Sequence, residues 1–261
     1  MALNPFSTDK HAERKLDLLR LLQGSSSIPL NDLASKLGVS GSTLRRDLHE
    51  LQEAGAVRLA AGRVEALASP GLEMPFTLRL LANRQEKQRI ARAALDLVQN
   101  GETIFIVGGT TTLELTRLLP GQRHLTVITN SLRVAYVLLD RPGIELIILG
   151  GRVRSGEQNL HGHLAEWGVQ QVRADKLFFG IQAINAQHGL THGQMVEVST
   201  DRALADAASQ VIVLVDHTKF GRVAPALVLP LNKVHTIITG FEIPPEQLEA
   251  LRAQNVRVMV V

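Results

Sequence analysis

From residue 103 to the end, the chain alternates regularly between short apolar segments and longer stretches with helical character. The apolar segments have the length and composition of buried strands. They are TIFIV (103–107), LTVIT (125–129), IELIIL (144–149), KLFFGI (176–181), VIVLV (211–215), HTIIT (235–239) and VRVMVV (256–261). Apolar strands that alternate with helices form a mainly parallel sheet with helices on both faces. The sequence therefore predicts an α/β fold for this part of the chain.

The composition fits a chain with a sizeable aliphatic core. Hydrophobic residues make up 45% of the 261 residues and aromatic residues only 3%, so the core is built mostly from Leu, Ile, Val and Ala. The absence of cysteine excludes disulfides and thiolate metal sites. No apolar run reaches the ~18–20 residues of a membrane helix, and the first residues lack the apolar core of a signal peptide. We therefore expect a soluble cytoplasmic protein.

A separate small domain is predicted ahead of the sheet. Residues 11–23 have helical spacing, and a second short helix starts near Pro29 and ends at Gly38. Ser40 is a good N-cap for a third helix that ends before Gly55. The segments AVRLA and RVEAL then alternate as two short strands about a tight turn. Three helices and a hairpin within about 65 residues are typical of a winged helix-turn-helix.

Proline and glycine separate the two parts. The stretch ALASPGLEMP (66–75) contains Pro70, Gly71 and Pro75 and is typical of a linker. We therefore divide the chain into a first domain of residues 1–66, a linker of residues 67–84 and a larger domain of residues 85–261.

The third helix has the pattern of a recognition helix. In a helix capped at Ser40, Leu44, Leu48 and Leu51 form one apolar stripe, while two arginines and several hydroxyl groups lie off that stripe. Arginine can bind the O6 and N7 atoms of guanine in the major groove. With the cations of the hairpin, the candidate DNA-contacting residues are Lys36, Ser40, Ser42, Thr43, Arg45, Arg46, Arg58 and Arg63.

Two observations weigh against a simple reading of this helix. A pair of adjacent arginines also occurs on ordinary solvated helix faces, so the motif alone is weak. The formal net charge is only +3, and acids in the first 65 residues offset the bases. If the helix binds DNA, the acids Asp17, Asp32, Glu50 and Glu53 must face away from it.

Polar residues follow four of the predicted strands in the larger domain. Ligands of open parallel sheets bind outside the carboxyl ends of the strands, so these residues are expected along one edge. Glycines allow backbone amides to approach a ligand, and threonines at a helix start favour a phosphate. The candidates are Gly108, Gly109, Thr110, Thr111, Thr112, Asn130, Ser131, Gly151, Arg154, Asp216 and Lys219.

These candidates divide by chemistry. Arg154 and Lys219 can form charge-assisted bonds to an anion, while Asn130 and Asp216 can hold hydroxyl groups. The alternative is that GGTTT and NS only cap helices and turns. The histidine pairs at 161 and 163 and at 188 and 192 lack an acid in a metal-binding spacing. We therefore expect no metal and no cofactor.

The motifs together carry a family resemblance. LNDLASKLGVSGSTLRRDLHELQEAGAVRLAAG resembles the winged helix-turn-helix of DeoR-type transcriptional regulators. NRQEKQRIA, GGTTTLEL, VITNSLRVA, LGGRVR and VDHTKFG match later blocks of that family in order, over nearly the whole chain. The resemblance implies an effector domain shaped like ribose-5-phosphate isomerase that senses a phosphorylated sugar. It also adds Glu197 to the effector candidates, as the match to the catalytic glutamate of the isomerases.

This chain departs from the family pattern at three places. The wing has Ala60, Ala61, Gly62 and Arg63 where the family often has His-Gly-Gly-Ala. Val107 replaces an aspartate that usually precedes the Gly-Thr-Thr stretch, and Gly240 replaces an aspartate after threonine. The resemblance therefore implies neither a wing histidine contact nor the usual kind of effector for this chain.

Three functions remain open at this point. The first is a regulator, by default a repressor of a sugar-metabolism operon, that binds operator DNA as a symmetric homo-oligomer and responds to a phosphorylated sugar. The second is a sugar-phosphate isomerase with an added DNA-binding domain, although FFGIQAIN lacks the carboxylates of the isomerase loop DGADE. The third is a DNA-packaging protein without a ligand.

Overall fold

The computed structural model describes residues 10–23, 27–53, 56–66, 74–121 and 124–261. The chain folds into two compact units, residues 1–82 and 83–261. No helix of the described segments is both long and apolar enough to cross a bilayer.

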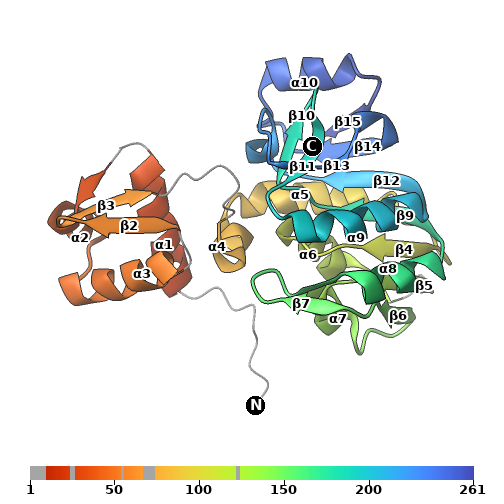
Figure 1. The fold of residues 1–261 in the computed structure, drawn as a ribbon, viewed down its shortest axis with the longest axis horizontal. Helices are drawn as coiled ribbons and strands as arrows, with labels where there is room; N and C mark the ends of the chain where they lie inside the picture. The colour runs from red at the N-terminus through yellow and green to blue at the C-terminus, as the bar shows by residue number, and fades with distance from the viewer. Residues whose placement is uncertain (1–9, 24–26, 54–55, 67–73, 122–123) are drawn as a thin grey trace. The chain divides into compact units, whose positions relative to one another are not determined.

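The first unit is a winged helix-turn-helix (Figure 1). Its three-stranded antiparallel sheet has the order β1-β3-β2. The elements are α1 (Lys10–Gln23), β1 (Ile28–Pro29), α2 (Leu30–Leu37), α3 (Gly41–Glu53), β2 (Val57–Ala60), β3 (Arg63–Ala66) and α4 (Phe76–Leu81). The fold class predicted for this part is confirmed.

Local signals in the sequence set the helix ends and the turn of the wing. Gly38 ends α2 in the left-handed conformation at φ 62°, where its amide and that of Val39 bind the last carbonyls. Ser40 Oγ accepts a hydrogen bond from the amide of Thr43 at 3.2 Å, as expected of an N-cap. Ala61 and Gly62 have φ values of 48° and 71°, which make the tight turn between β2 and β3.

Leucines form the core of this unit. Leu44, Leu48 and Leu51 of α3 are fully buried against Leu18 of α1 and Leu33 of α2, so the predicted stripe is confirmed. Helix α4 lies in the stretch that we expected to be a linker, and its Leu78 packs into the same core. Residues 67–73 of that stretch lie outside the described residues.

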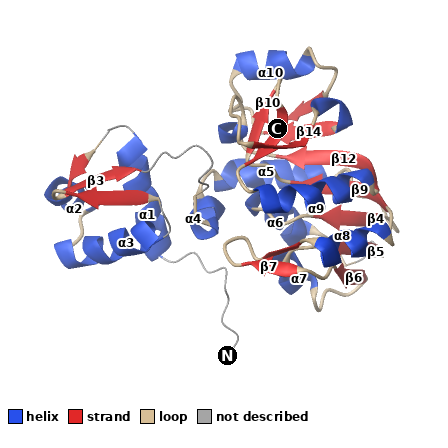
Figure 2. Ribbon diagram, viewed as in Figure 1, coloured by secondary structure: helices blue, strands red, loops and turns tan. Residues whose placement is uncertain are grey.

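The second unit is built on a seven-stranded parallel sheet (Figure 2). Its order is β15-β14-β12-β9-β4-β5-β6, and each strand contains or overlaps one of the seven predicted apolar segments. The strands are β4 (Thr103–Ile106), β5 (Leu125–Thr129), β6 (Ile144–Ile148), β9 (Ala174–Phe179), β12 (Ala208–Leu214), β14 (Thr236–Thr239) and β15 (Arg257–Val260).

Helices cover both faces of this sheet. Helices α5 (Arg84–Leu95), α6 (Thr110–Leu118) and α7 (Leu132–Leu138) share one hydrophobic core with it. Helices α8 (His163–Gln170), α9 (Met195–Asp206) and α10 (Pro245–Arg252) share the other. The chain leaves β4 toward β5 on one side and later returns to pair β9 on the other. Ligands of open α/β sheets bind at such a switch point.

Small strands surround the carboxyl edge of the sheet. β7 (Arg152–Arg154) and β8 (Asn159–His161) form an antiparallel hairpin. β10 (Ala183–Asn185), β11 (Gly189–His192) and β13 (Ala226–Leu229) form a second, three-stranded sheet. These pieces were not predicted, since strands of three or four residues depend on their tertiary partners.

Candidate functional site

The solvent-facing side of α3 carries the two adjacent arginines. Arg45 and Arg46 are exposed, and neither forms a hydrogen bond or ion pair with any residue that the structure describes. Ser40 lies at the start of the helix with hydrogen bonds to the hydroxyls of Ser42 (3.0 Å) and Thr43 (2.8 Å). Arginine and hydroxyl groups therefore share one accessible end of α3, which is the arrangement that major-groove contact needs.

Two of the three acids of α3 pair with cations of α1. Asp47 is fully buried and accepts two hydrogen bonds from Arg14, at 2.5 and 2.9 Å. Glu50 binds Lys15 at 2.5 Å and His11 at 3.0 Å, and the hydrogen bond from Lys15 helps to lower the pKa of Glu50. These ion pairs neutralise Asp47 and Glu50, while Glu53 is exposed near the end of α3.

The cations of the wing and of α2 are exposed but differ in their contacts. Arg58 pairs with Glu65 across the hairpin at 2.6 Å. Arg63 donates hydrogen bonds to the hydroxyl and carbonyl oxygens of Ser27, at 2.8 and 2.9 Å. Lys36 is exposed in the last turn of α2. A role for these three cations in DNA binding stays a prediction.

At the carboxyl edge of the second unit, α6 begins directly after β4. Thr110, Thr111 and Thr112 are buried in its first turn, and the Thr112 hydroxyl donates to the carbonyl of Gly109 at 3.1 Å. The absence of a side chain at Gly108 is needed for packing, whatever its backbone amide binds. The carboxamide of Asn159 occupies the space beside its Cα, so a side chain at Gly108 would overlap Asn159.

Asn130 and Ser131 follow β5 at the same edge and are buried. Asn130 Nδ2 donates to the carbonyl of Leu160 in β8 at 3.2 Å, and Ser131 forms a β-bridge with Asn159. Gly151, at φ 140°, lies where a side chain would meet the backbone of His161. Its lack of a side chain therefore lets β7 pack against β8.

Asp216 follows β12 and is surrounded by cations and donors. Lys87 Nζ lies 3.9 Å from its Oδ2, Asn83 Nδ2 lies 3.4 Å from its Oδ1, and the amide of Thr218 donates to Oδ1 at 3.0 Å. Burial alone raises the pKa of Asp216, but Lys87, Lys219 and the hydrogen bonds of Thr218 outweigh it and leave the pKa below its ordinary value. Asp216 is therefore a buried anion at neutral pH.

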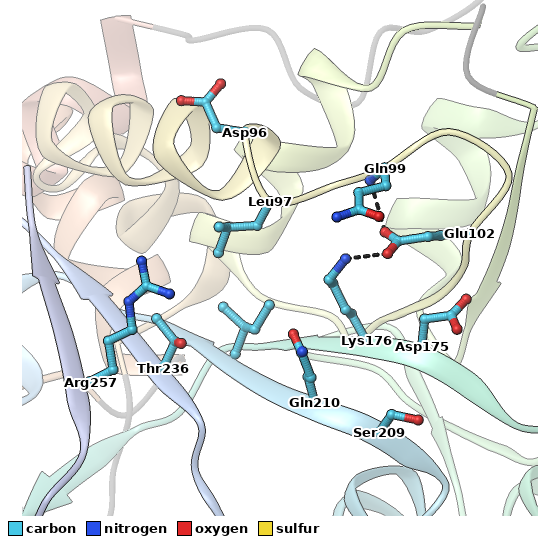
Figure 3. Close-up of a pocket in the computed structure, with 11 residues that line it drawn as sticks. Asp96, Leu97, Gln99, Glu102, Asp175, Lys176, Ser209, Gln210, Thr236 and Arg257 are labelled. Atoms are coloured by element: carbon cyan, nitrogen blue, oxygen red, sulfur yellow. Dashed lines mark hydrogen bonds and ion pairs between the residues drawn. The ribbon is translucent and has the colours of Figure 1, made fainter.

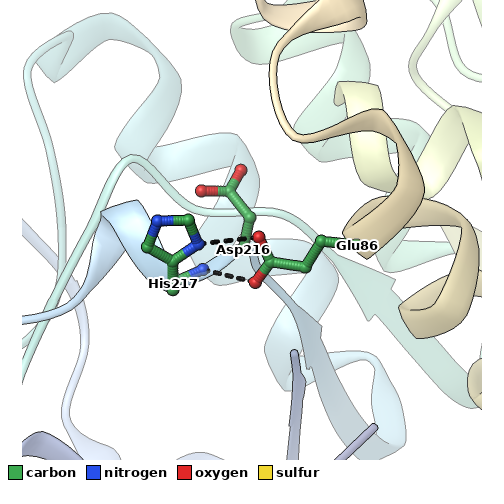
Figure 4. Close-up of side chains that lie close together, drawn as sticks. All are labelled: Glu86, Asp216 and His217. Atoms are coloured by element: carbon green, nitrogen blue, oxygen red, sulfur yellow. Dashed lines mark hydrogen bonds and ion pairs between the residues drawn. The ribbon is translucent and has the colours of Figure 1, made fainter. Parts of the chain in front are cut away.

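Glu86 lies beside this group and binds His217 with both carboxylate oxygens (Figure 4). Burial raises the pKa of Glu86, although the hydrogen bonds from His217 partly oppose the rise. Among the described residues, Glu86, Asp216 and His217 form the one trio whose ligand atoms lie close enough for a metal ion. The ammonium group of Lys87 beside Asp216 and the hydrogen bonds between Glu86 and His217 are unfavourable for a cation there.

A second polar cluster joins the β7–β8 hairpin to the start of α9. Arg154 and Glu197 form an ion pair with each other. The Nε2 atoms of His161 and His192 lie 3.9 and 3.8 Å from Glu197 Oε2. No sequence spacing connects these histidines to an acid, because residues 161, 192 and 197 come together only through the fold.

Arg154 and His161 also line a cavity of about 540 Å³. Its other lining residues are Arg152, Val153, Ser155, Gly162 and Val196. Burial and the charge of Glu197 together raise the pKa of Asp201, which lies one helical turn further along α9.

Another hollow lies at the opposite, amino-terminal edge of the sheet (Figure 3). It measures about 400 Å³, and Lys176 pairs with Glu102 on its wall. None of the predicted site residues lines it. Glycine, hydroxyl and cation candidates lie instead at the carboxyl edge.

A winged helix-turn-helix with an accessible cationic helix, followed by a separate α/β unit, defines a transcriptional regulator with its own sensor domain. Comparison with protein families agrees with this class. The model of the DeoR C-terminal sensor domain matches residues 82–240, and an HTH domain model matches residues 14–72. The chain belongs to the DeoR family of HTH-type transcriptional regulators.

Curated relatives align over nearly their full length. The HTH-type transcriptional regulator GolR of Listeria innocua is 33% identical over 88% of this chain and 91% of its own. The HTH-type transcriptional repressor CsqR of Escherichia coli K12 is 32% identical over 94% and 92%. The glycerol-3-phosphate regulon repressor of the same strain is 29% identical over 95% and 98%. As a member of this family, the chain is a regulator rather than an isomerase.

The chain also aligns with two kinds of solved structure. Ribose 5-phosphate isomerase A from Methanocaldococcus jannaschii aligns over 53% of this chain and 55% of its own, with 20% identity and a TM-score of 0.40. The translation initiation factor eIF-2B from Pyrococcus horikoshii OT3 aligns over 87% and 86%, with 16% identity and a TM-score of 0.42.

Proposed function

We propose that this protein is a repressor of a sugar-metabolism operon, whose operator binding is modulated by a phosphorylated sugar. The observation that carries the proposal is the presence, in one chain, of a helix-turn-helix with two accessible arginines and a DeoR sensor domain. Relatives with repression in their names support the sign of regulation.

The first half of α3 enters the major groove in this proposal. Arg45 and Arg46 bind guanine edges or phosphates, and Ser40, Ser42 and Thr43 contact the backbone near the helix start. The wing places Arg58 and Arg63 along the flanking backbone, and Lys36 reaches a phosphate from α2. The pairing of Asp47 and Glu50 with cations of α1 supports this proposal, because it neutralises two of the three acids of α3.

The effector binds outside the carboxyl ends of β4, β5 and β12. Its phosphate lies at the start of α6, where the amides of Thr110, Thr111 and Thr112 and the helix dipole favour an anion. Gly109 leaves room for this approach. Lys219 and Arg154 add charge, Asp216 accepts hydroxyl groups, and Glu197 holds Arg154 in place.

Binding of the effector changes operator affinity through subunit geometry. A single winged domain reads few base pairs, so a symmetric homo-oligomer that spans two half-sites supplies the rest of the affinity. To change occupancy from 99:1 to 1:99, the effector must favour one state by about 5.5 kcal/mol.

The test combines two measurements on the purified full-length protein. Fluorescence anisotropy compares a DNA fragment from upstream of the chain's own gene with a scrambled duplex of equal length. A thermal-shift screen then measures stabilisation by a panel of sugar phosphates, and hits are added to the DNA titration. A specific complex that a sugar phosphate weakens supports the proposal, while equal binding to both duplexes contradicts it.

A further inference from the structure

Buried polar atoms without a hydrogen-bond partner gather at one place in the second unit. Asn130, Ser131, Asn159 and His161 have side-chain atoms that no group in the described part of the protein satisfies. Their relative exposures are 1%, 0%, 3% and 6%. Leaving a buried donor or acceptor unpaired costs about 1–3 kcal/mol, so a cluster of them indicates a place built for another molecule.

The backbone brings these four residues together. Strand β8 runs beside the loop that follows β5, where Ser131 bridges to Asn159 and the amide of Leu160 donates to the Asn130 carbonyl at 2.7 Å. The side chain of Asn159 extends over Gly108 at the end of β4. His161 lies two residues further along β8, hence on the same face of the strand, and lines the 540 Å³ cavity.

The unpaired atoms differ in the kind of hydrogen-bond partner that each of them needs. The Oδ1 atoms of Asn130 and Asn159 are acceptors only, and the bond from Asn130 Nδ2 to Leu160 fixes the orientation of the first amide. A phosphate group offers mainly acceptor oxygens, so it cannot satisfy an amide oxygen. A hydroxyl group both donates and accepts, so it can satisfy these amides, the Ser131 hydroxyl and an imidazole ring.

The protonation state of the His161 ring is consistent with an uncharged partner. Burial and the charge of Arg154 lower the pKa of His161 to about 4, although Glu157 opposes the shift. The ring is therefore neutral near pH 7 and offers one N–H donor and one nitrogen acceptor. This N–H donor and this nitrogen acceptor together complement a sugar hydroxyl group, which can both accept and donate a hydrogen bond.

We propose that Asn159 and His161 of β8, together with Asn130 and Ser131, bind hydroxyl groups of the effector and so determine which sugar phosphate the protein recognises. This inference rests on the proposed function and divides the site into two parts. The start of α6 holds the phosphate, and β8 holds the polyhydroxyl part. Asn159 and His161 thereby become specificity residues that no motif in the sequence indicates.

The first experiment measures binding by isothermal titration calorimetry to the full-length protein. The probes are inorganic phosphate, glycerol 3-phosphate, ribose 5-phosphate, fructose 6-phosphate and galactose 6-phosphate. The variants are Asn159→Leu, His161→Phe and His161→Gln. We expect the two apolar variants to bind the tightest sugar phosphate about 10–100-fold more weakly, to bind inorganic phosphate like the wild type, and His161→Gln to recover part of the loss.

Each result has a defined meaning. If the wild type binds none of the sugar phosphates, the proposed function fails and this inference fails with it. If the wild type binds one of them and both apolar variants keep its affinity, only this inference is wrong. Equal loss of inorganic phosphate and sugar phosphate also contradicts it, because β8 would then hold the phosphate.

The thermal stability of the free protein shows whether the side chains of Asn159 and His161 serve binding or hold the fold together. Replacing an unpaired buried amide by an apolar side chain of similar shape is close to neutral or stabilising. We therefore expect Asn159→Leu to keep or raise the melting temperature of the free protein while it weakens sugar binding. A large drop in the melting temperature of both Asn159→Leu and His161→Gln contradicts the proposal, because the side chains would then be structural.

Discussion

The carboxylate of Glu86 lies in the space that a side chain at Gly240 would occupy. A Cβ at Gly240 would come within 2.5 Å of Glu86 Cγ and 2.6 Å of Glu86 Oε1, and also within 2.2 Å of Glu242 Oε2. From this position Glu86 accepts hydrogen bonds from the backbone amide of His217 at 2.7 Å and from its ring at 2.8 Å. The glycine that departs from the family pattern therefore makes room for the contact that holds the loop after β12.

Substitution at this glycine should disturb the effector site from a distance. We expect Gly240→Ala to displace both Glu86 and Glu242, to loosen the loop after β12, and to lower the free energy of unfolding by about 1–3 kcal/mol. Urea unfolding and the effector-dependent DNA titration measure the two effects. Gly156→Ala is the control, since a Cβ there meets no atom within 4 Å. Equal behaviour of the two variants would show that Glu86 adjusts without consequence.

The recognition helix gives a direct test of DNA binding. Because Arg45 is exposed and has no partner in the described structure, its replacement should change DNA binding without unfolding the protein. We expect Arg45→Ala to cost about 1–3 kcal/mol of operator affinity and to relax base preference. Anisotropy titrations with the operator and with single-base variants measure both. Arg252→Ala, on the exposed side of α10, should bind DNA like the wild type.

Affinity and base preference that stay the same in Arg45→Ala would show that α3 is not the recognition helix. A uniform loss across all sequences would instead assign Arg45 to a phosphate.

The ion pair between Asp47 of α3 and Arg14 of α1 should stabilise the first unit more than an exposed ion pair does, because Asp47 is buried. Asp47 is fully buried, so its removal leaves the guanidinium of Arg14 without its main partner. We expect Asp47→Ala to destabilise the first unit by about 3–5 kcal/mol. Asp17→Ala breaks an exposed pair with Arg20 and should change stability by less than about 1 kcal/mol. Urea unfolding followed by circular dichroism distinguishes the two, and similar small losses would contradict the importance of burial here.

Much of this fold can be predicted from the sequence because its signals are local. Each strand of the parallel sheet contains a short, mainly apolar segment, and Gly38 and Ser40 mark helix ends by their own chemistry. Helix α4 was not predicted because it has only six residues and depends on the packing of Leu78 against the first unit.

The candidate site was predictable only in part. Strand ends pointed to Asn130 and Asp216, since parallel strands place their carboxyl ends at one edge. Glu86 and Lys87 were missed because a charged pair within a helix looks like a solvated face. Asn159 and His161 were missed because the segment before α8 has no periodicity, and its pairing with the loop after β5 exists only in the folded chain.

Lys219 provides a test of the effector site that leaves the DNA-binding unit intact. It lies in the short helical turn after Asp216, and its charge helps to lower the pKa of that carboxylate. We expect Lys219→Ala to bind operator DNA normally but to need about 10–100-fold more sugar phosphate for release. Lys233→Ala removes an exposed lysine paired with Asp206 and serves as the control. A Lys219→Ala protein that responds at the same effector concentration would remove this residue from the site.

The buried ring of His161 should make stability depend on pH. Its pKa is lowered to about 4 in the folded protein, chiefly by burial and then by Arg154, whereas an unfolded histidine titrates near 6.5. The unfolded state therefore binds more protons between these values, so stability is complete above about pH 6.5 and is lost as the pH falls toward 4. The loss from this group amounts to at most about 3 kcal/mol.

We expect His161→Phe to reduce the slope of unfolding free energy against pH in this window, measured by urea titrations at half-unit steps. His163→Phe, two residues away on an exposed position, should keep the wild-type slope. An unchanged slope in His161→Phe would show that folding does not lower the pKa of this ring, and would contradict its burial as the cause of the pH dependence.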